Sequence, residues 1–399
     1  MRPRVDVKAP ACAISAMPRS GIREVMELAS RREGVLHLEV GEPDFQTPPH
    51  IVEAAARAAA DGYTKYTPNR GLPSVVEAIC EKLARRNGVA AEPEHVVVTS
   101  GAVGAIMGAL IALVEPGEGI LLPDPGWPNY EMMAAVIGAH TVAYPLEAAN
   151  GYEPDLERLA DLAARPGAKA IVVNSPGNPT GAVWSRETIE RVVEIASAHG
   201  LYVVSDEVYE EIVFEGEHVS PATFDEDGRV ITVSGVSKTY AMTGWRVGYL
   251  AASPEIAGLV AKVQEPLVAC AASVSQRAAE AALTGPQDCV VTMRDAYRSR
   301  RDVAVATLGG HGLLVSEPRG AFYILADVGR ATEDTYAFAR ALVEEHALAV
   351  APGATFGPGG RGLVRLSLAS ATEVIEEGIA RLAIAVEGWP EGRHASMGT

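Results

Sequence analysis

Between about residues 95 and 252, short apolar runs of strand length alternate with longer stretches of helical periodicity. The short runs are His95–Val98, Gly119–Leu122, Thr141–Tyr144, Ala168–Val173, Leu201–Val204, Val230–Val233 and Val247–Ala251. Runs that are apolar throughout are typical of strands buried on both faces, and helical patterns such as Ser185–His199 separate several of them. The alternation predicts an α/β domain with a mainly parallel sheet, covered by helices on both faces.

The pattern changes after this region. Ser253-Pro254 has the form of a helix start, with Ser as N-cap and Pro at the first helical position, and helical patterning continues from about Ile256 to Leu308. Strand-like runs then alternate with helices: the strands are Ala321–Ala326, Leu348–Ala351 and Leu363–Leu368, and the helices are Thr335–His346 and Thr372–Ala385. This arrangement predicts a second, smaller α+β domain.

Composition narrows the class of protein. The chain has 399 residues, 48% of them hydrophobic, which is enough for a large core, and its net charge of -17 disfavours nucleic acid or an anionic membrane as a partner. It has no apolar run of about 18 residues, and its start lacks the apolar core of a signal peptide. The four cysteines and nine histidines form no metal-binding cluster, so we expect reduced thiols, no metal and a cytoplasmic location.

Lys238 is the most informative residue. It lies between two apolar runs, Val230–Val233 and Val247–Ala252, so it is not an ordinary surface lysine. Burial and a nearby cation both favour the neutral amine, which is the form that attacks an aldehyde. Arg246 could supply that cation and also bind a phosphate. One ligand with both an amine-reactive carbonyl and a phosphate is pyridoxal 5′-phosphate (PLP), although a lone lysine in a loop is more often a solvated charge.

Polar residues follow several of the predicted strands, where α/β sheets bind ligands. They are Ser100, Asp124, Asn174, Asn178, Asp206 and Lys238. A carboxylate at Asp206 could keep a pyridine nitrogen protonated, or it could cap a helix. Asn178, in the turn Asn178–Gly181, can aim an amide at a ligand oxygen, although the segment alone is only a turn.

Three further segments carry candidate binding groups. The small residues at Gly101–Val103 open a helix whose backbone N–H groups could bind a phosphate. Trp127 offers a stacking surface for a flat ring, or a packed core side chain. Arg365, in the apolar run Leu363–Leu368, needs an anion, which could be a ligand carboxylate or a structural partner. Gly357–Gly362 fits G-x-G-x-x-G but precedes a strand, so we reject a dinucleotide site there.

Together these residues resemble the PLP-dependent class I/II aminotransferases of fold type I, the aspartate aminotransferase superfamily. The resemblance extends from Gly41–Phe45 to about residue 385, and it is most specific in Ser-Lys followed by Ala-Met-Thr-Gly-Trp-Arg-Val-Gly. Asn-Pro-Thr-Gly, Ser-Asp-Glu-Val-Tyr and Gly-Ala-Phe-Tyr occur in the family order. It implies a seven-stranded, mainly parallel large PLP-binding domain (residues 50–290) and a smaller α+β domain (residues 291–399), with an N-terminal arm and part of the small domain in residues 1–49.

The resemblance also implies roles in holding the cofactor. Lys238 would form the internal aldimine and move a proton between the substrate and the cofactor. Asp206 would pair with the pyridinium nitrogen, and Asn178 and Tyr209 would donate hydrogen bonds to the phenolic oxygen. Trp127 would stack on the ring. The phosphate would be held by Ser237, Arg246 and the backbone at Gly101, Ala102 and Val103.

For the substrates, the resemblance implies that Arg365 grips the α-carboxylate in a pocket also lined by Gly41, Trp127 and Asn178. Tyr66 matches the tyrosine that reaches the phosphate of the neighbouring subunit, which implies a homodimer with active sites at the interface. The expected reaction is ping-pong transfer of an amino group from an L-amino acid to a 2-oxo acid. The alternative is β-elimination, decarboxylation or oxidation on the same scaffold.

The chain departs from the family pattern at Gly235, where many relatives carry a polar phosphate ligand, and Ser234 or Ser237 could take over. The helix Ala102–Val114 contains no lysine that could bind a distal carboxylate, so a less acidic amino donor is favoured. We also expect Ile14–Met17 to form a lid over the site.

Overall fold

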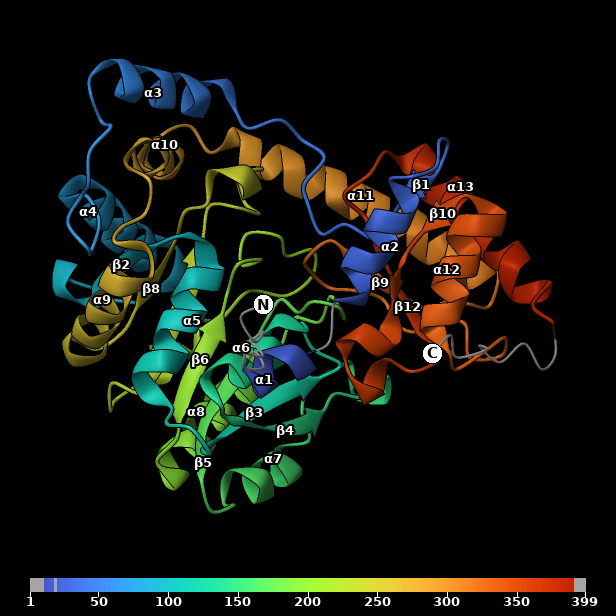
Figure 1. Cartoon of the computed structure of the whole chain (residues 1–399), viewed down its shortest axis with the longest axis horizontal. Coiled ribbons are helices and arrows are strands. Elements are labelled where there is room, and N and C mark those ends of the chain that lie inside the picture. The colour runs from blue at the N-terminus through green and yellow to red at the C-terminus, as the bar shows by residue number, and fades with distance from the viewer. Residues whose placement is uncertain (1–10, 18–19, 391–399) are drawn as a thin grey trace, which may run out of the picture.

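A seven-stranded sheet forms the centre of the larger part of the molecule (Figure 1). The computed structural model describes residues 11–17 and 20–390. The strands are β2 (Val96–Thr99), β3 (Gly119–Asp124), β4 (His140–Pro145), β5 (Ala168–Asn174), β6 (Tyr202–Asp206), β7 (Val230–Gly235) and β8 (Gly248–Ala251). Their order is β2-β8-β7-β6-β5-β3-β4, and only β8 runs antiparallel to its neighbours. The predicted mainly parallel sheet is therefore confirmed.

Several strands continue beyond the apolar runs that predicted them. Asp206 still pairs with Asn174 of β5 and Val233 of β7, although the apolar run ends at Val204. Backbone pairing does not depend on the side chain, so the ladder extends into the polar residues at the carboxyl ends. These residues are thereby held on a rigid edge of the sheet.

Helices cover both faces of this sheet, as its doubly buried strands require. One face packs against α5 (Gly101–Leu113), α6 (Asn129–Ile137) and α9 (Pro254–Val268). The other face packs partly against α7 (Leu156–Ala163) and α8 (Arg186–His199), and partly against α3 (Pro49–Ala60), α4 (Pro73–Lys82) and α10 (Ser273–Thr284). Within β5, Val172 faces the first set while Ile171 and Val173 face the second, as the two-residue period of a strand dictates.

The long helical pattern after residue 253 forms three helices rather than one. Ser253 caps α9 by accepting a hydrogen bond from Ile256 N, and Pro254 occupies its first turn, as predicted. Breaks then separate α9, α10 and α11 (Asp288–Gly310), the second of them at Gly285-Pro286. A proline that has no N–H to donate explains this second break.

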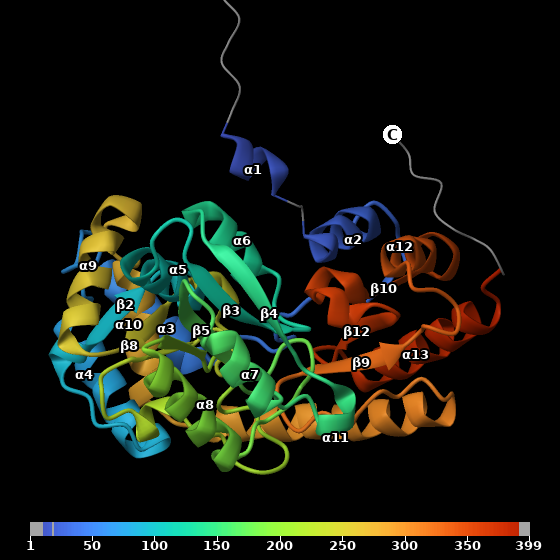
Figure 2. The same ribbon diagram turned by 90° about the horizontal axis from the view of Figure 1, so that it is seen from below.

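The smaller part combines N-terminal and C-terminal segments. A three-stranded antiparallel sheet has the order β11 (Ala351–Pro352), β12 (Leu363–Ser367) and β9 (Tyr323–Asp327), and β1 (Leu36–His37) pairs in parallel with β10 (Leu348–Ala349). The helices here are α2 (Gly21–Ala29), α12 (Thr335–His346) and α13 (Thr372–Glu387), and α11 runs along one edge below β9 and α13 (Figure 2). The predicted domain boundaries at residues 49/50 and 290/291 stay a prediction.

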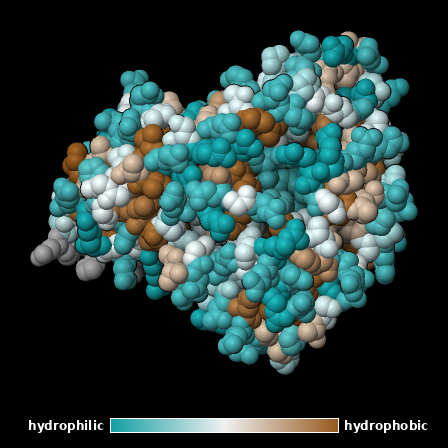
Figure 3. All heavy atoms as spheres, turned by 180° about the vertical axis from the view of Figure 1, so that it is seen from behind, coloured by the Kyte–Doolittle hydropathy of each residue, from teal (hydrophilic) through white to brown (hydrophobic). Residues whose placement is uncertain are grey.

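On the face of the molecule shown in Figure 3, hydrophobic residues form separate small groups within a largely hydrophilic surface. A short helix, α1 (Cys12–Ala16), precedes α2. Within residues 11–17 and 20–390, no helix is both long and apolar enough to cross a membrane.

Candidate active site

A pocket of about 650 Å³ opens at the carboxyl ends of β5 and β6, between the large sheet, α2 and β12. It collects nearly all the site residues predicted from the sequence. Those that line it are Gly41, Ala102, Val103, Trp127, Asn178, Asp206, Tyr209, Ser237, Lys238, Arg246 and Arg365. Gly101 and Tyr66 are not part of its lining. Of the six polar residues that follow predicted strands, Asn174, Asn178, Asp206 and Lys238 line the pocket, whereas Ser100 and Asp124 do not.

Lys238 projects its amine into this pocket from the loop after β7. Its Nζ donates a hydrogen bond to the carbonyl oxygen of Gly41 at 2.6 Å. Burial, followed by the positive charge of Arg365, lowers the pKa of Lys238 to about 8, although Glu42 and Asp206 oppose this. A lysine with this pKa has a substantial neutral fraction near neutral pH and can act as a nucleophile.

Asp206 is buried at the end of β6, and its carboxylate is held by two donors. Tyr130 Oη donates to its Oδ2 at 2.6 Å, and Val208 N to its Oδ1 at 3.4 Å. Burial raises the pKa of Asp206 to about 6, and the bond from Tyr130 works against that rise. A carboxylate in this setting gains from a cationic partner, which a protonated pyridine ring would supply.

Asn174, at the end of β5, ties two predicted site residues together. Its Nδ2 donates to the backbone oxygen of Asp206 at 3.0 Å, and its Oδ1 accepts from the backbone N of Asn178 at 2.8 Å. The sequence placed Asn174 at a strand end but assigned it no role. It fixes the turn that carries Asn178 against the strand that carries Asp206.

Arg365 lies fully buried on β12, at the junction of the two parts of the molecule. Its Nη1 donates to Asn178 Oδ1 at 3.0 Å and its Nη2 to the backbone oxygen of Glu39 at 2.5 Å, while its buried Nε has no partner. The guanidinium also lies 4.2 Å from the centre of the Tyr323 ring. Its described contacts contain no carboxylate, so a structural salt bridge is not observed and the arginine is available to an anionic ligand.

Tyr209 and Tyr323 form a hydroxyl pair beside Arg365, with 2.8 Å between their oxygens. Burial raises the pKa of the Tyr209 phenol, so it stays protonated and can donate a hydrogen bond. The position of Tyr323 also explains why residue 41 is a glycine, because a Cβ there would lie 2.2 Å from the Tyr323 hydroxyl. Only glycine lets the backbone pass this close to the ring.

The start of α5, Ser237 and Arg246 enclose one corner of the pocket. A Cβ at Gly101, whose φ is +73°, would lie 2.5 Å from Arg246 Nη2, and a Cβ at Gly248 would lie 2.4 Å from the backbone N of Ala102. The close approach brings a guanidinium to the free N–H groups of a helix start, where an anion is stabilised. This donor set fits a phosphate.

The departure at Gly235 has a structural cause. A Cβ there would lie 3.0 Å from both Gly248 Cα and the Val247 carbonyl oxygen, because β7 and β8 pack closely. Ser234 cannot substitute for a phosphate ligand either, since it is buried and donates to Glu210 Oε1 at 2.6 Å. Of the two serines considered, only Ser237 lines the pocket.

Known proteins that are similar in sequence belong to the family that the motifs of this chain resemble. Residues 33–382 match the family described as aminotransferase class I and II. The chain is 39% identical to the aspartate/prephenate aminotransferase of Thermus thermophilus over 361 residues, which is 89% of this chain and 92% of that protein. The chain belongs to the class I and II aminotransferases. It is an enzyme that acts on amino and 2-oxo acids, in a family that is PLP-dependent.

Solved aminotransferase structures share this fold. The Thermus thermophilus aspartate aminotransferase with maleate superposes with a TM-score of 0.90 at 38% identity, and covers 95% of this chain and 100% of that one. An alanine aminotransferase from Pyrococcus furiosus also gives a TM-score of 0.90, at 30% identity and with the same coverage. The fold type I architecture of this aminotransferase is therefore shown.

Two features of the aminotransferase pocket were not assigned from the sequence. Tyr130, three residues after Trp127, donates a hydrogen bond to Asp206. Its place soon after the end of a strand, together with its hydroxyl group, is the sequence signal from which this role could have been predicted. Ser20 and the first two turns of α2, including Ile22 and Met26, also line the pocket. The expected lid, Ile14–Met17, is not among the lining residues and stays a prediction. Tyr66, which the resemblance expects to reach the neighbouring subunit, is 88% exposed in the single chain.

Proposed function

We propose that this aminotransferase binds PLP in the pocket around Lys238. The proposal rests on three groups that meet in one pocket: a lysine of lowered pKa, a buried carboxylate, and a buried arginine that has no carboxylate among its contacts with the described residues. Bound PLP would supply a carbonyl carbon and an electron-withdrawing ring. Lys238 fits the carbonyl, Asp206 the pyridine nitrogen, and Asn178 with Tyr209 the phenolic oxygen.

The other groups complete the fit. Trp127 lines the wall beside Tyr130, where its indole can cover a flat ring. The backbone of Gly101, Ala102 and Val103, together with Ser237 and Arg246, would hold the phosphate. In the reaction, Arg365 and Asn178 orient the substrate carboxylate beside Gly41. Lys238 would take the proton from the substrate Cα as a general base and deliver it to the cofactor carbon that had carried the carbonyl oxygen.

The reaction we propose is ping-pong transfer: an amino acid leaves as a 2-oxo acid before a second 2-oxo acid takes up the amino group. Lys238→Ala should abolish transfer and the covalent capture of PLP while the fold is retained; full activity in this variant would refute the role of Lys238. Single-turnover mixing of the holoenzyme with an amino acid distinguishes the alternatives. Stoichiometric pyridoxamine phosphate indicates transfer, whereas ammonia, carbon dioxide or oxygen uptake indicates elimination, decarboxylation or oxidation.

We propose a homodimer in which Tyr66 reaches the phosphate of the neighbouring subunit. Thr67 N donates to Cys270 Sγ at 3.5 Å, which places the exposed Tyr66 next to the end of α9. Leu267 and Val268 at that end are about half exposed, so this part of the surface carries three exposed apolar side chains, as an interface would. Tyr66→Phe should weaken PLP binding without changing the dimer mass measured by light scattering. A monomeric wild type would overturn the proposal.

For the amino donor, we propose a preference for an uncharged side chain. Ile22, Met26, Val103 and Met132 line the outer pocket, and the charges that α2 adds there, Arg23 and Glu27, are of opposite sign. A second carboxylate would find no net positive charge in this wall. A panel of donors with 2-oxoglutarate and pyruvate tests this; a highest kcat/KM for aspartate or glutamate would refute it. The cytoplasmic location stays a prediction.

A further inference from the structure

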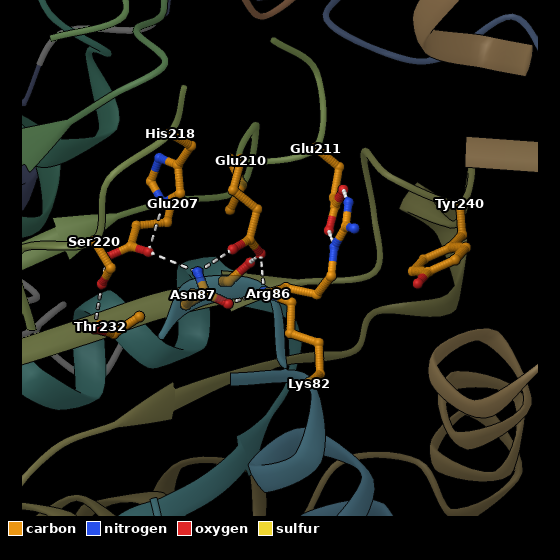
Figure 4. A network of polar contacts seen from close by, with 12 residues as sticks. Lys82, Arg86, Asn87, Glu207, Glu210, Glu211, His218, Ser220, Thr232 and Tyr240 are labelled. Carbon is orange, nitrogen blue, oxygen red and sulfur yellow. Dashed lines mark hydrogen bonds and ion pairs between the residues drawn. The ribbon is translucent and has the colours of Figure 1, made fainter. Parts of the chain in front are cut away.

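Behind the Asp206–Tyr209 segment, on the side away from the pocket, lies a buried polar network that the reaction itself does not use. We call it the anchoring network; Figure 4 shows its members. They are Lys82 at the end of α4, Asn87 at the end of the helical turn Leu83–Asn87, Glu207, Glu210 and His218. The first four are buried, and the side chain of His218 is 8% exposed.

Each carboxylate of the anchoring network is held by several groups. Glu207 accepts from Ser220 Oγ at 2.8 Å and lies 2.9 Å from His218 Nε2. Glu210 lies 2.5 Å from the Lys82 ammonium. Asn87 joins the two halves, because its Nδ2 donates to Glu210 at 2.6 Å and to Glu207 at 3.3 Å while its Oδ1 accepts from Lys82 at 2.8 Å.

The segment presents its residues to two different environments. Asp206 and Tyr209 line the pocket, whereas Glu207 and Glu210, each the next residue along the chain, are held by the anchoring network. The backbone adds two fixed points, from Glu207 N to Val233 O at 2.8 Å and from Glu210 N to Glu207 O at 3.0 Å. The turn that carries Asp206 and Tyr209 is therefore held by contacts of the residues that do not line the pocket.

Each of the two carboxylates in the network has a basic partner, Lys82 for Glu210 and His218 for Glu207. Burial alone would lower the pKa of Lys82, but Glu210 outweighs it and raises that pKa, so the ammonium persists. Likewise burial opposes protonation of His218, but its bond to Glu207 raises the pKa of the ring. The ligand atoms of Glu207, Glu210 and His218 lie within 4.8 Å of one another, yet the Lys82 ammonium already supplies the cation there.

Buried ion pairs often contribute little net stability, because the charges lose their hydration, and in some proteins they select one conformation instead. We propose that Lys82, Asn87, Glu207, Glu210 and His218 are positioning residues, which hold Asp206 and Tyr209 at the angle and depth that the pyridine nitrogen and the phenolic oxygen of PLP require. This inference rests on the proposed function of the pocket.

The test uses the double variant Lys82→Met/Glu210→Gln, which removes an ion pair without leaving a buried charge unpaired. Arg301→Met is the matched control, because Arg301 is also buried, pairs with Glu215 at 2.8 Å and does not line the pocket. Three quantities are compared with wild type: the Kd of the apoenzyme for PLP, the pH midpoint of the absorbance of bound PLP, and the melting temperature.

We expect the double variant to bind PLP at least tenfold more weakly and to move the absorbance midpoint by more than half a pH unit, while KM for the amino acid changes less than twofold because Arg365 is untouched. The control should lose melting temperature but keep wild-type Kd and midpoint. A double variant with wild-type Kd and midpoint, whatever its melting temperature, overturns the inference.

Asn87→Ala keeps the inference testable if the double variant does not fold. It removes the residue that joins the two carboxylates and should shift Kd and midpoint in the same direction, and unchanged values again overturn the proposal. Lys82→Arg, which retains the cation, should restore most of the binding. If wild-type apoenzyme itself fails to bind PLP, the proposed function falls; if wild type binds and the variants equal it, only the positioning role falls.

Discussion

Capture of PLP by the apoenzyme should accelerate as pH rises through about 8, far below the range in which an ordinary lysine titrates. Only the neutral amine of Lys238 attacks the carbonyl, and burial together with Arg365 lowers its pKa from 10.5 to about 8. At pH 7.5, about a quarter of such amines are neutral, against about one in a thousand for an ordinary lysine. The structure thus predicts a gain of roughly 200-fold in reactive amine at this pH.

Stopped-flow mixing of apoenzyme with excess PLP between pH 6.5 and 10 measures this capture. The same reaction with Nα-acetyllysine corrects for titration of PLP itself, and borohydride reduction followed by peptide mapping identifies Lys238 as the attachment site. Two variants sharpen the test because they act in opposite directions. Arg365→Met removes a charge that lowers the pKa of Lys238 and should raise the midpoint, whereas Asp206→Asn removes a charge that raises it and should lower the midpoint.

A wild-type midpoint near 10.5 would refute the reasoning, because it would mean that burial and Arg365 do not act on the amine as described. Movement of both variants in the same direction would equally show that the electrostatic account is wrong.

Three further predictions follow from single contacts. Arg365→Met should lower kcat/KM about 30- to 4,000-fold in steady-state assays with every amino acid used, because losing one partner of a buried charge pair costs about 2–5 kcal/mol. Unchanged values would exclude a role of Arg365 in binding the carboxylate. Gly248→Ala, whose Cβ would lie 2.4 Å from Ala102 N, should raise the Kd for PLP roughly tenfold or more by displacing the phosphate corner, while Gly244→Ala, with open space around its Cβ, should not. Tyr130→Phe removes a hydrogen bond that lowers the pKa of Asp206, so the acidic limb of the kcat–pH profile should move to higher pH; a limb that stays or moves lower contradicts the assignment.

Much of the candidate site could be predicted from the sequence, because its signals are local. Apolar runs of strand length recur because each strand is buried on both faces, and polar residues that end those runs must meet at one edge of a parallel sheet. Asp206, Asn178 and Lys238 were found in this way, and all three line the pocket. The spacing of residues around Lys238 was specific enough to indicate the family, which the comparisons confirmed.

Other features depend on contacts between segments that are distant in the chain. Nothing local shows that Tyr130 donates to Asp206, or that Ser234 serves Glu210 while Ser237 lines the pocket. The pairing of Lys82 with Glu210 likewise arises only when α4 packs behind the turn after β6.

The sequence by itself determined the sheet, its mainly parallel character and the chemical groups at its edge. Strands that are buried on both faces are apolar throughout, and their alternation with helices indicates a parallel sheet. Only the tertiary structure decided which group faces which, since hydrogen-bond partners and pKa shifts depend on the distances and burial that folding creates. Arg365 illustrates the difference. An arginine in an apolar strand predicts an anionic partner, but the sequence does not say which one. In the described structure the guanidinium contacts Asn178 and a backbone carbonyl rather than a carboxylate, so it is available to a ligand.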